Sequence, residues 1–255
     1  MASYRYRAEM PANHIGAKLN DFTADILVFS KPQASDVDVA IKAKKLGQTV
    51  IADFCDDHFD HPQLGHTYRK FAELADVCVA PTATMAERVP HKQTAVIPDP
   101  YEMPEESEHA DGDRVLWFGH NAGLKALYYQ PPNLTIVTGP KVKDGWVPYS
   151  LETLTEEMRK ANIAIFPTIK GHEYKSPNRL INALRMGLFP VCDPHPSYTE
   201  FKKFIWSTEV PTGIKWCREF RHELNDFVRE GQNYIRDRFS PEAIGNQWRE
   251  LLGSL

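Results

Sequence analysis

Residues 174–198 read YKSPNRLINALRMGLFPVCDPHPSY, and this stretch predicts a helix followed by a buried strand. Ser176 suits the N-cap of the helix, Pro177 suits its first position, and Gly187 suits the position just past its end. The continuous apolar run 188–192 that follows is typical of a strand buried on both faces. A helix that leads directly into such a strand indicates an α/β protein.

The two faces of this predicted helix differ in character. Four polar residues at i, i+3, i+4 and i+7 share the face opposite the apolar stripe: Lys175, Asn178, Arg179 and Asn182. Free N–H groups and the helix dipole favour an anion at a helix N-terminus, so this face predicts a site for a phosphorylated ligand. Lys175 and Arg179 would neutralise a diphosphate, and Ser176 would hydrogen-bond it. The alternative is a surface helix with a solvated basic end.

The composition is that of an ordinary globular protein. Of the 255 residues, 42% are hydrophobic and 25% are charged, and the formal net charge is −4. This charge indicates no polyanion partner across the whole surface, although a local basic patch stays open. The first twenty residues hold no signal-peptide core, and no run approaches the roughly 20 apolar residues of a membrane span. We therefore expect a cytoplasmic protein.

The four cysteines are far apart in the sequence and form no CxxC pair. Cys78 and Cys192 lie within apolar, strand-like runs, so we expect them to be buried free thiols. The sequence therefore predicts neither a zinc site nor a disulfide framework.

Short apolar runs alternate with helix-like segments through most of the chain. Continuously apolar strands in this alternation predict parallel sheets covered by helices on both faces. The polar, acidic stretch 99–113 has the composition of a linker. We therefore expect two Rossmann-like domains, residues 1–105 and 106–255, that face a cleft. The second domain is expected to end in helices, and ligands are expected to bind beyond the carboxyl ends of the strands. The expected strands are 26–30, 49–54, 77–80, 94–97, 114–118, 134–138, 163–167 and 188–192.

Residues 119–123, GHNAG, follow one of these strands. Glycine at a strand-to-helix turn lets the backbone approach a phosphate closely, so Gly119 is a candidate for ligand binding. His120 and Lys125 are the side chains that could reach the ligand. The stretch matches neither GxGxxG nor a P-loop, and a simple tight turn would look the same.

Residues 53–61, DFCDDHFDH, group carboxylates and imidazoles after the second expected strand. In this position Asp56, Asp57 or His58 could bind or activate an acceptor hydroxyl. A metal site is one alternative, but no i, i+4 histidine pair on a helix supports it, so we expect none. An acidic loop with a helix cap is the other alternative.

Aromatic and basic residues interleave at the N-terminus, in the run YRYR at 4–7. Such residues stack on bases or sugars and pair with phosphates, so Arg5, Arg7 and His14 are candidates for acceptor binding. Ordered surface is the alternative. In the turn after the run 188–192, Ser197 could meet a sugar or a phosphate.

Together, these segments resemble the GT-B glycosyltransferases, in particular the large retaining family 4. Their donor domains carry a pattern of the type YKS-x-x-K-x-x-E-A-x-x-x-G-x-P-V-V-x-S, followed by a turn and Tyr-x-Glu; residues 174–200 here read YKSPNRLINALRMGLFPVCDPHPSYTE. Bacterial and phage members carry further segments similar to RYRAEMPANHIGAKL, GQTVIADFCDDHFD and ADVCVAPTATMAERV of this chain. The resemblance covers most of the chain, up to about Glu200.

The resemblance implies a UDP- or GDP-sugar donor on the C-terminal domain, an acceptor on the N-terminal domain and no metal for the chemistry. By position, Lys175, Ser176 and Arg179 would contact the diphosphate and ribose, and Gly119 would line the pyrophosphate. The chain departs from the family at Asn182, where members usually have a glutamate that binds the donor ribose. It also begins where members already have a first strand, so the N-terminal domain looks trimmed.

The leading hypothesis is therefore a glycosyltransferase, with retention expected from the resemblance and no cofactor besides the donor. The acceptor stays open among a glycan, a small molecule and, as in phage-type enzymes, a hydroxymethylated base in DNA. Two other classes remain as alternatives. One is a non-catalytic nucleotide-sugar-binding protein, which Asn182 favours, and the other is a metal-dependent hydrolase built on residues 56–61.

Overall fold

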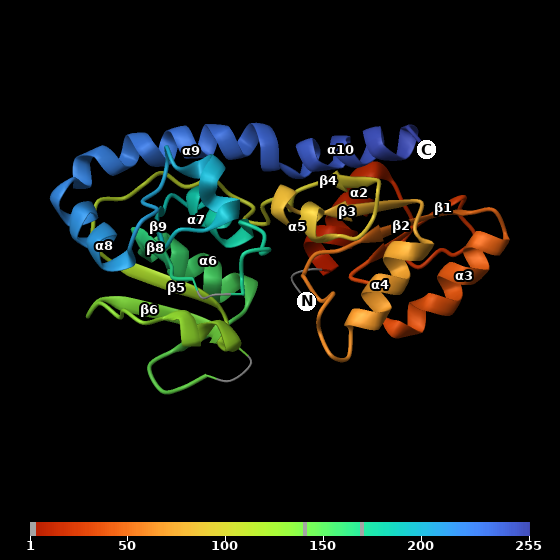
Figure 1. Ribbon diagram of the computed structural model, residues 1–255. Helices are drawn as coiled ribbons and strands as arrows, with labels where there is room; N and C mark the ends of the chain where they lie inside the picture. The colour runs from red at the N-terminus through yellow and green to blue at the C-terminus, as the bar shows by residue number, and fades with distance from the viewer. Residues whose placement is uncertain (1–3, 140–141, 169–170) are drawn as a thin grey trace. The chain divides into compact units, whose positions relative to one another are not determined.

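The structure is a computed structural model that describes residues 4–139, 142–168 and 171–255, and these form two compact units (Figure 1). Unit 1 holds the chain up to Pro100, the short segment Tyr174–Ser176 and the C-terminal stretch Phe239–Leu255. Unit 2 holds Tyr101–Glu173 and Pro177–Arg238. Tyr174–Ser176, which come just before Pro177 and the predicted helix, thus belong to a different unit from the helix itself.

Unit 1 is built on a four-stranded parallel sheet with the strand order β1-β2-β3-β4. The strands are β1 (Ile26–Ser30), β2 (Thr49–Asp53), β3 (Val77–Ala80) and β4 (Thr94–Val96). The helices of this unit are η1 (Arg5–Glu9), α2 (Met10–Ile15), η2 (Ala34–Asp36), α3 (Val37–Lys45), α4 (Gly65–Leu74), α5 (Ala83–Arg88) and α10 (Pro241–Gly253).

The core of unit 1 has two layers, because successive residues of a strand point to opposite faces of the sheet. On β2, Val50 and Ala52 pack into the cluster that includes residues of α3, α4 and α5. Ile51, between them, packs against Ile244 and Trp248 of α10. Figure 1 accordingly shows α10 on the side of the sheet opposite α3 and α4.

The expectation that residues 106–255 would group together is wrong for the C-terminal helix, because α10 packs with unit 1. Ile244 and Trp248 are buried there against the sheet. Gly245 lets α10 lie close to α2, since a Cβ at this position would collide with the ring of His14. The apolar stripe of α10 thus covers a sheet face that would otherwise be exposed to water.

Unit 2 is built on a five-stranded parallel sheet with the strand order β7-β6-β5-β8-β9. Its helices α8 and α9 pack on one core cluster with residues from strands β5, β6, β8 and β9. The strands are β5 (Val115–His120), β6 (Leu134–Gly139), β7 (Val147–Pro148), β8 (Ile163–Phe166) and β9 (Phe189–Cys192). The helices are η3 (Asn121–Ala126), α6 (Leu151–Lys160), α7 (Asn178–Arg185), η4 (Pro196–Phe201), α8 (Val210–Glu219), η5 (Arg221–Glu223) and α9 (Leu224–Phe239).

The predicted C-terminal end of α7 is confirmed, and its predicted N-cap is not. Gly187 follows the helix with φ +77°, and a Cβ there would collide with the carbonyl groups of Ser107 and Glu108, so glycine is required as predicted. The predicted N-cap is wrong. The N-cap residue is Pro177, whose side chain cannot cap, and Ser176 lies one residue before the N-cap position.

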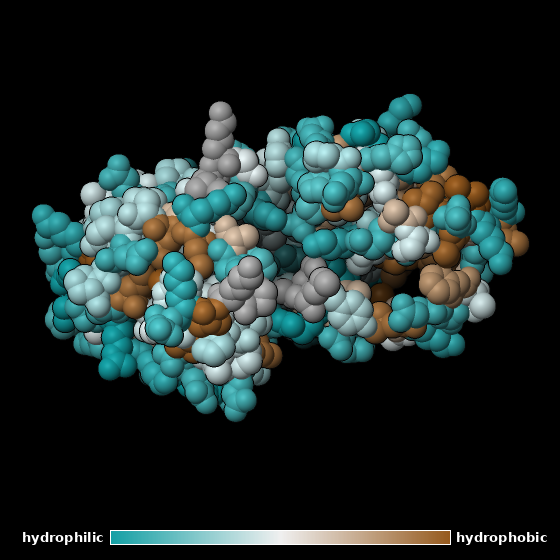
Figure 2. Space-filling view, turned by 90° about the horizontal axis from the view of Figure 1, so that it is seen from below, coloured by the Kyte–Doolittle hydropathy of each residue, from teal (hydrophilic) through white to brown (hydrophobic). Residues whose placement is uncertain are grey.

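The structure confirms an α/β protein with two Rossmann-like units and parallel sheets, while the expected cleft between them stays a prediction. All four cysteines are free, and Cys78 and Cys192 are buried as expected. Hydrophobic surface is broken into separate patches by hydrophilic side chains in the view of Figure 2. Among the described residues, no helix is long and apolar enough to cross a membrane, and the expected cytoplasmic location stays a prediction.

Candidate functional site

Charged side chains gather beyond the carboxyl ends of β1 and β2 in unit 1. Lys31 directly follows β1, and its Nζ lies 3.0 Å from Oδ2 of Asp56, in the loop after β2. Lys175 approaches from another part of the chain and places its Nζ 2.5 Å from Oδ1 of the same carboxylate. His58 lies nearby, with Nε2 4.0 Å from Asp56 Oδ2. We call Lys31, Asp56, His58 and Lys175 the Asp56 cluster.

The Asp56 cluster favours an ionised carboxylate beside a neutral imidazole. Burial by itself would raise the pKa of Asp56, but the ammonium groups of Lys175 and Lys31 outweigh it and lower the pKa below its ordinary value. Burial lowers the pKa of His58, with Lys31 and Lys175 adding to the effect against the attraction of Asp56. At neutral pH both groups are therefore able to accept a hydrogen bond from a hydroxyl group.

Two buried hydroxyl groups next to this cluster make no hydrogen bond of ordinary geometry within the described residues. They are the OH of Tyr68, on α4, and the Oγ of Ser176. The Tyr68 hydroxyl lies close enough to Asp56 and Cys55 for their charges to raise its pKa, after the larger effect of burial. Ser176 lies beside the carboxyl of Asp99. Buried hydroxyls normally have partners; Ser176 has Asp99 within reach, so a water or a ligand hydroxyl is expected at Tyr68.

Asp57, the other carboxylate expected in catalysis, shapes its own loop. Its Oδ1 accepts a hydrogen bond of 3.1 Å from the N–H of Phe59, and its Oδ2 lies 3.0 Å from Nε of Arg88. Both carboxylate oxygens are thus engaged within the loop and α5. These contacts are those of an acidic loop, the alternative to a catalytic role, and a role of Asp57 with the acceptor stays a prediction.

Arg7, which we expected to bind an acceptor, is instead the centre of a buried ion network. Only 2% of its surface is exposed, and its guanidinium donates to both oxygens of Asp53, at 2.5 and 3.0 Å. It also donates to the carbonyl of Ile97 at 2.6 Å and lies 3.3 Å from Asp99. Burial alone would lower the pKa of Arg7, but the two carboxylates raise it. Arg7 therefore holds β2 and the end of the sheet to η1 and does not face a ligand.

The other two N-terminal candidates are His14 and Arg5. His14 connects α2 to α10, because Arg249 donates to its carbonyl at 2.7 Å and lies 3.1 Å from its Nε2. This contact explains His14 as a structural residue. Arg5 is half-buried in η1, and its role in acceptor binding stays a prediction.

Gly119 and Arg179 lie together at the carboxyl end of β5 in unit 2. A Cβ on Gly119 would lie 3.1 Å from Nη1 of Arg179, so glycine makes room for the guanidinium. Arg179 Nη1 donates to the carbonyl of Phe118 at 3.2 Å, and the guanidinium lies 5.4 Å from the ring centre of Phe166. The first turn of α7 therefore presents a positive charge at the edge of the sheet where α/β proteins bind ligands.

Three further donor candidates surround this position in sequence. His120 is exposed, and its Nδ1 accepts a 3.2 Å hydrogen bond from the N–H of Ala122, so it caps η3. Lys125 is exposed on η3, and Asn178 is half-buried as the first residue of α7. Their contacts with a donor stay predictions.

Asn182, expected to face the donor, is directed into the core of unit 2. It is 2% exposed, and its Oδ1 accepts hydrogen bonds from the N–H groups of Glu102 (2.9 Å) and Met103 (3.2 Å). Its Nδ2 donates to the carbonyl of Asn178 at 2.9 Å. The predicted donor contact is therefore not supported, because this amide fastens the chain at 102–103 to α7.

Replacing Asn182 by alanine is expected to lower the free energy of unfolding by about 1–3 kcal/mol, because the buried N–H of Met103 loses its acceptor. Denaturant titration measures this change. Asn178→Ala is the matched control on the same helix, since the side chain of Asn178 is half-buried, and it is expected to cost less than about 0.5 kcal/mol. Equal losses in the two variants would contradict the structural role of Asn182.

Ser197 lies in the loop after β9, where it is 8% exposed. Its Oγ lies 2.7 Å from Nδ1 of His195, whose Nε2 lies 2.7 Å from the carbonyl of His172. The loop borders a pocket of about 430 Å³. The pocket is lined by Pro194, His195, Pro196, Tyr198, Thr199, Lys202 and Ser207. Ser197 therefore supports His195 at this pocket, and its contact with a donor stays a prediction.

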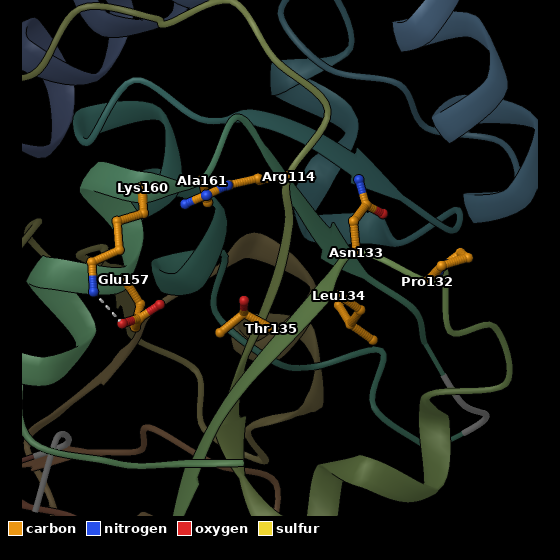
Figure 3. A pocket seen from close by; sticks show the side chains of 8 residues that line it. All are labelled: Arg114, Pro132, Asn133, Leu134, Thr135, Glu157, Lys160 and Ala161. Atoms are coloured by element: carbon orange, nitrogen blue, oxygen red, sulfur yellow. Dashed lines mark hydrogen bonds and ion pairs between the residues drawn. The ribbon is translucent and has the colours of Figure 1, made fainter. Parts of the chain in front are cut away.

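A second pocket of unit 2, about 290 Å³ in volume, lies at the opposite edge of the sheet, where β5 and β6 begin (Figure 3). Arg114, Asn133 and the ion pair of Glu157 with Lys160 are among its lining residues (Figure 3). This edge is remote from the carboxyl ends of the strands. The pocket is therefore not part of the site at Gly119 and Arg179.

The residues missed from the sequence are Lys31 and Tyr68. Lys31 had a signal, since it is the first residue after an expected strand and so lies at the edge where ligands bind. Tyr68 had none, because a tyrosine on a helix beside Phe71 is indistinguishable from ordinary core packing. Among the described residues, no group of three or more His, Cys, Asp or Glu side chains could hold a metal ion.

No model of a known protein family matches the chain, and no curated protein matches it. Solved structures do match. HepE of Anabaena, in complex with UDP-glucose, superposes with a TM-score of 0.70 at 14% identity, over 91% of this chain and 79% of that one. Sucrose-phosphate synthase from Thermosynechococcus elongatus gives a TM-score of 0.62 at 12% identity, over 86% of this chain and 72% of that one.

A third similar structure is an alpha-glucosyltransferase in complex with UDP-glucose and DNA containing an abasic site. It gives a TM-score of 0.55 at 12% identity, over 91% of this chain and 81% of that one. These likenesses show that the chain has the fold of GT-B glycosyltransferases, so the resemblance noted from the sequence motifs is confirmed at the level of the fold.

Proposed function

We propose that the protein is a glycosyltransferase that moves a sugar from a nucleoside-diphosphate sugar to an acceptor hydroxyl group. The observation that carries this proposal is the guanidinium of Arg179 beside Gly119, at the carboxyl end of a parallel sheet and in the first turn of α7. The fold supports it, because HepE of Anabaena and the alpha-glucosyltransferase with the same fold were both solved with UDP-glucose. UDP-glucose is therefore the first donor to test.

The donor diphosphate would bind unit 2. Arg179 would neutralise the negative charge that grows on the diphosphate as the bond to the sugar breaks, and the N–H groups of the first turn of α7 would hydrogen-bond its oxygens. Gly119 would let the backbone of β5 approach the pyrophosphate. A guanidinium held in place before the reaction stabilises the leaving group without reorganising, which is how electrostatic catalysis lowers a barrier.

The acceptor hydroxyl would bind the Asp56 cluster in unit 1. The carboxylate of Asp56 would accept its hydrogen bond and orient the oxygen for attack on the anomeric carbon. His58, which is neutral at pH 7, would be a second acceptor for the same proton. Retention of configuration and independence from metal ions are part of the proposal and rest on the family resemblance.

Replacing Arg179 by alanine is expected to weaken binding of UDP-glucose at least about fivefold, because it removes a charge-assisted interaction worth more than ~1 kcal/mol. Isothermal titration of the folded variant with UDP-glucose, and with a GDP-sugar if the wild type prefers one, measures the change. Arg229→Ala is the matched control in unit 2, since Arg229 is exposed on α9 and pairs only on the surface with Asp226. Donor affinity that is the same in both variants would refute the role of Arg179.

DNA is the acceptor that one specific observation favours, because the similar alpha-glucosyltransferase was solved with DNA. Duplex DNA with and without hydroxymethylated cytosine, incubated with each donor and digested to nucleosides, tests this version. A nucleoside heavier by one sugar supports a DNA acceptor. Transfer to a glycan or a small molecule, with DNA left unmodified, would contradict a DNA acceptor and would leave the proposed sugar transfer with a different acceptor.

A further inference from the structure

Lys31 has a backbone conformation that lysine rarely adopts. Its φ is +54°, in the left-handed region, directly after the last residue of β1. Among the described residues other than glycine, Asn20 alone shares a positive φ, and asparagine tolerates this region well. A β-carbon makes the conformation costly, and such strain persists where the surrounding structure imposes it, often at functional sites.

Both the backbone and the side chain of Lys31 are held by contacts. Its N–H donates a 2.9 Å hydrogen bond to the carbonyl of Asp53, so the backbone continues the pairing of β1 with β2 for one residue. The side chain then reaches the loop after β2, where its Nζ lies 3.0 Å from Oδ2 of Asp56. The side chain that leaves this turn thus brings its ammonium to Asp56, in the loop that follows the neighbouring strand.

The two oxygens of Asp56 have different partners. Oδ2 is held by Lys31, whose side chain is 34% exposed, and Oδ1 is held by Lys175, whose side chain is 52% exposed. The more exposed lysine is the easier one to displace, because it loses less when water replaces the contact. The charged and titratable groups that face Asp56 from the surrounding elements are Lys31, Lys175, Cys55, His58 and Tyr68.

We propose that Lys31 is a positioning residue for the acceptor. Its ammonium fixes Oδ2 of Asp56, so the carboxylate keeps one orientation while Oδ1 exchanges Lys175 for the acceptor hydroxyl. This inference rests on the proposed function, in which Asp56 receives the acceptor. Lys31 does not touch the substrate, and its effect is confined to the direction and the ionisation of the carboxylate.

Three variants separate the charge of Lys31 from its backbone strain. Lys31→Met removes the charge and keeps the strain, Lys31→Gly removes both, and Lys31→Arg keeps both. In the first two, the acceptor kcat/KM is expected to fall about tenfold, the factor for one charge-assisted hydrogen bond, with unchanged affinity for the donor. The acid limb of the pH profile moves to higher pH, since Asp56 loses a cation. Lys31→Arg is expected to keep both properties near those of the wild type.

A carboxyl-carbon NMR titration of Asp56 in the same proteins keeps this inference separate from the proposed function. The pKa of Asp56 is expected to rise in Lys31→Met and Lys31→Gly and to stay low in Lys31→Arg. If the wild type transfers no sugar, the proposed function fails, while the titration still shows whether Lys31 controls Asp56. An unchanged pKa in Lys31→Met, or full activity in Lys31→Gly, would overturn the positioning role, because the lysine would then matter only to the turn.

Discussion

Replacing Asp56 by asparagine is expected to lower kcat/KM for the acceptor at least about a hundredfold, the lower range for losing a positioned group that acts on a proton. The amide keeps the shape of the side chain but loses the charge that Lys31 and Lys175 hold at 3.0 and 2.5 Å. Initial rates of sugar transfer at saturating donor measure the effect. Donor affinity is expected to stay unchanged, because Arg179 and Gly119, which would bind the diphosphate, lie in unit 2.

The pH dependence of the wild type follows from the same carboxylate. Because Lys175 and Lys31 outweigh burial and lower the pKa of Asp56, transfer is expected to hold from neutral pH down into the acid range. It falls only as the pH drops through the lowered pKa and Asp56 is protonated.

The control for Asp56→Asn is Asp76→Asn. Asp76 is also paired with a lysine, Lys44, but it lies before β3, at the other edge of the sheet. Equal loss of transfer in the two variants would contradict the assignment.

Replacing Arg7 by methionine is expected to lower the free energy of unfolding by about 3–5 kcal/mol, the range for removing one partner from a buried ion network. Asp53 and Asp99, 0% and 5% exposed, would keep charges or protons in the core without the guanidinium. Equilibrium denaturation followed by circular dichroism measures the loss. A variant that cannot fold would also show that stability depends on this network.

The control for Arg7 is Arg229→Met, which breaks an exposed ion pair and is expected to cost less than about 0.5 kcal/mol. A loss below about 1 kcal/mol for Arg7→Met would show that the network contributes little to stability.

The strands were predictable because a parallel strand covered on both faces is continuously apolar. The predicted strands at 26–30 and 77–80 coincide with β1 and β3, and the other long runs differ from the observed strands by one or two residues. The two-residue strand β7 (Val147–Pro148) was missed, because so short a strand has no periodicity to detect. The single turn at Gly187 was predicted because it depends on local backbone geometry alone.

The roles of Arg7 and Asn182 were not predictable from local patterns. Arg7 meets Asp53 and Asp99, which lie 46 and 92 residues further along the chain, and Asn182 meets the backbone of Glu102, 80 residues earlier. A basic residue near aromatic neighbours, or a polar residue on a helix face, looks the same whether it binds a ligand or a buried partner. Long-range partners decide between these outcomes, and a single sequence does not show them.

The packing of α10 with unit 1 was likewise not predictable from local patterns. Its apolar residues Ile244 and Trp248 predict a helix with one buried face, but they do not identify which sheet receives that face. The uncovered side of β2 and β3 receives it, through Ile51 and Val79. The position of the helix at the end of the sequence suggested the neighbouring domain instead.

Release of the nucleoside diphosphate from a panel of UDP- and GDP-sugars, followed together with the mass of each acceptor, measures the proposed reaction most directly. The panel needs a glycan, a small polyol and hydroxymethylated DNA as acceptors. A glycosyltransferase is expected to consume one donor and to add one sugar mass to one acceptor in equal amounts, with both signals lost in Asp56→Asn. A donor that binds tightly but stays intact with every acceptor would contradict the enzyme and favour a nucleotide-sugar-binding protein.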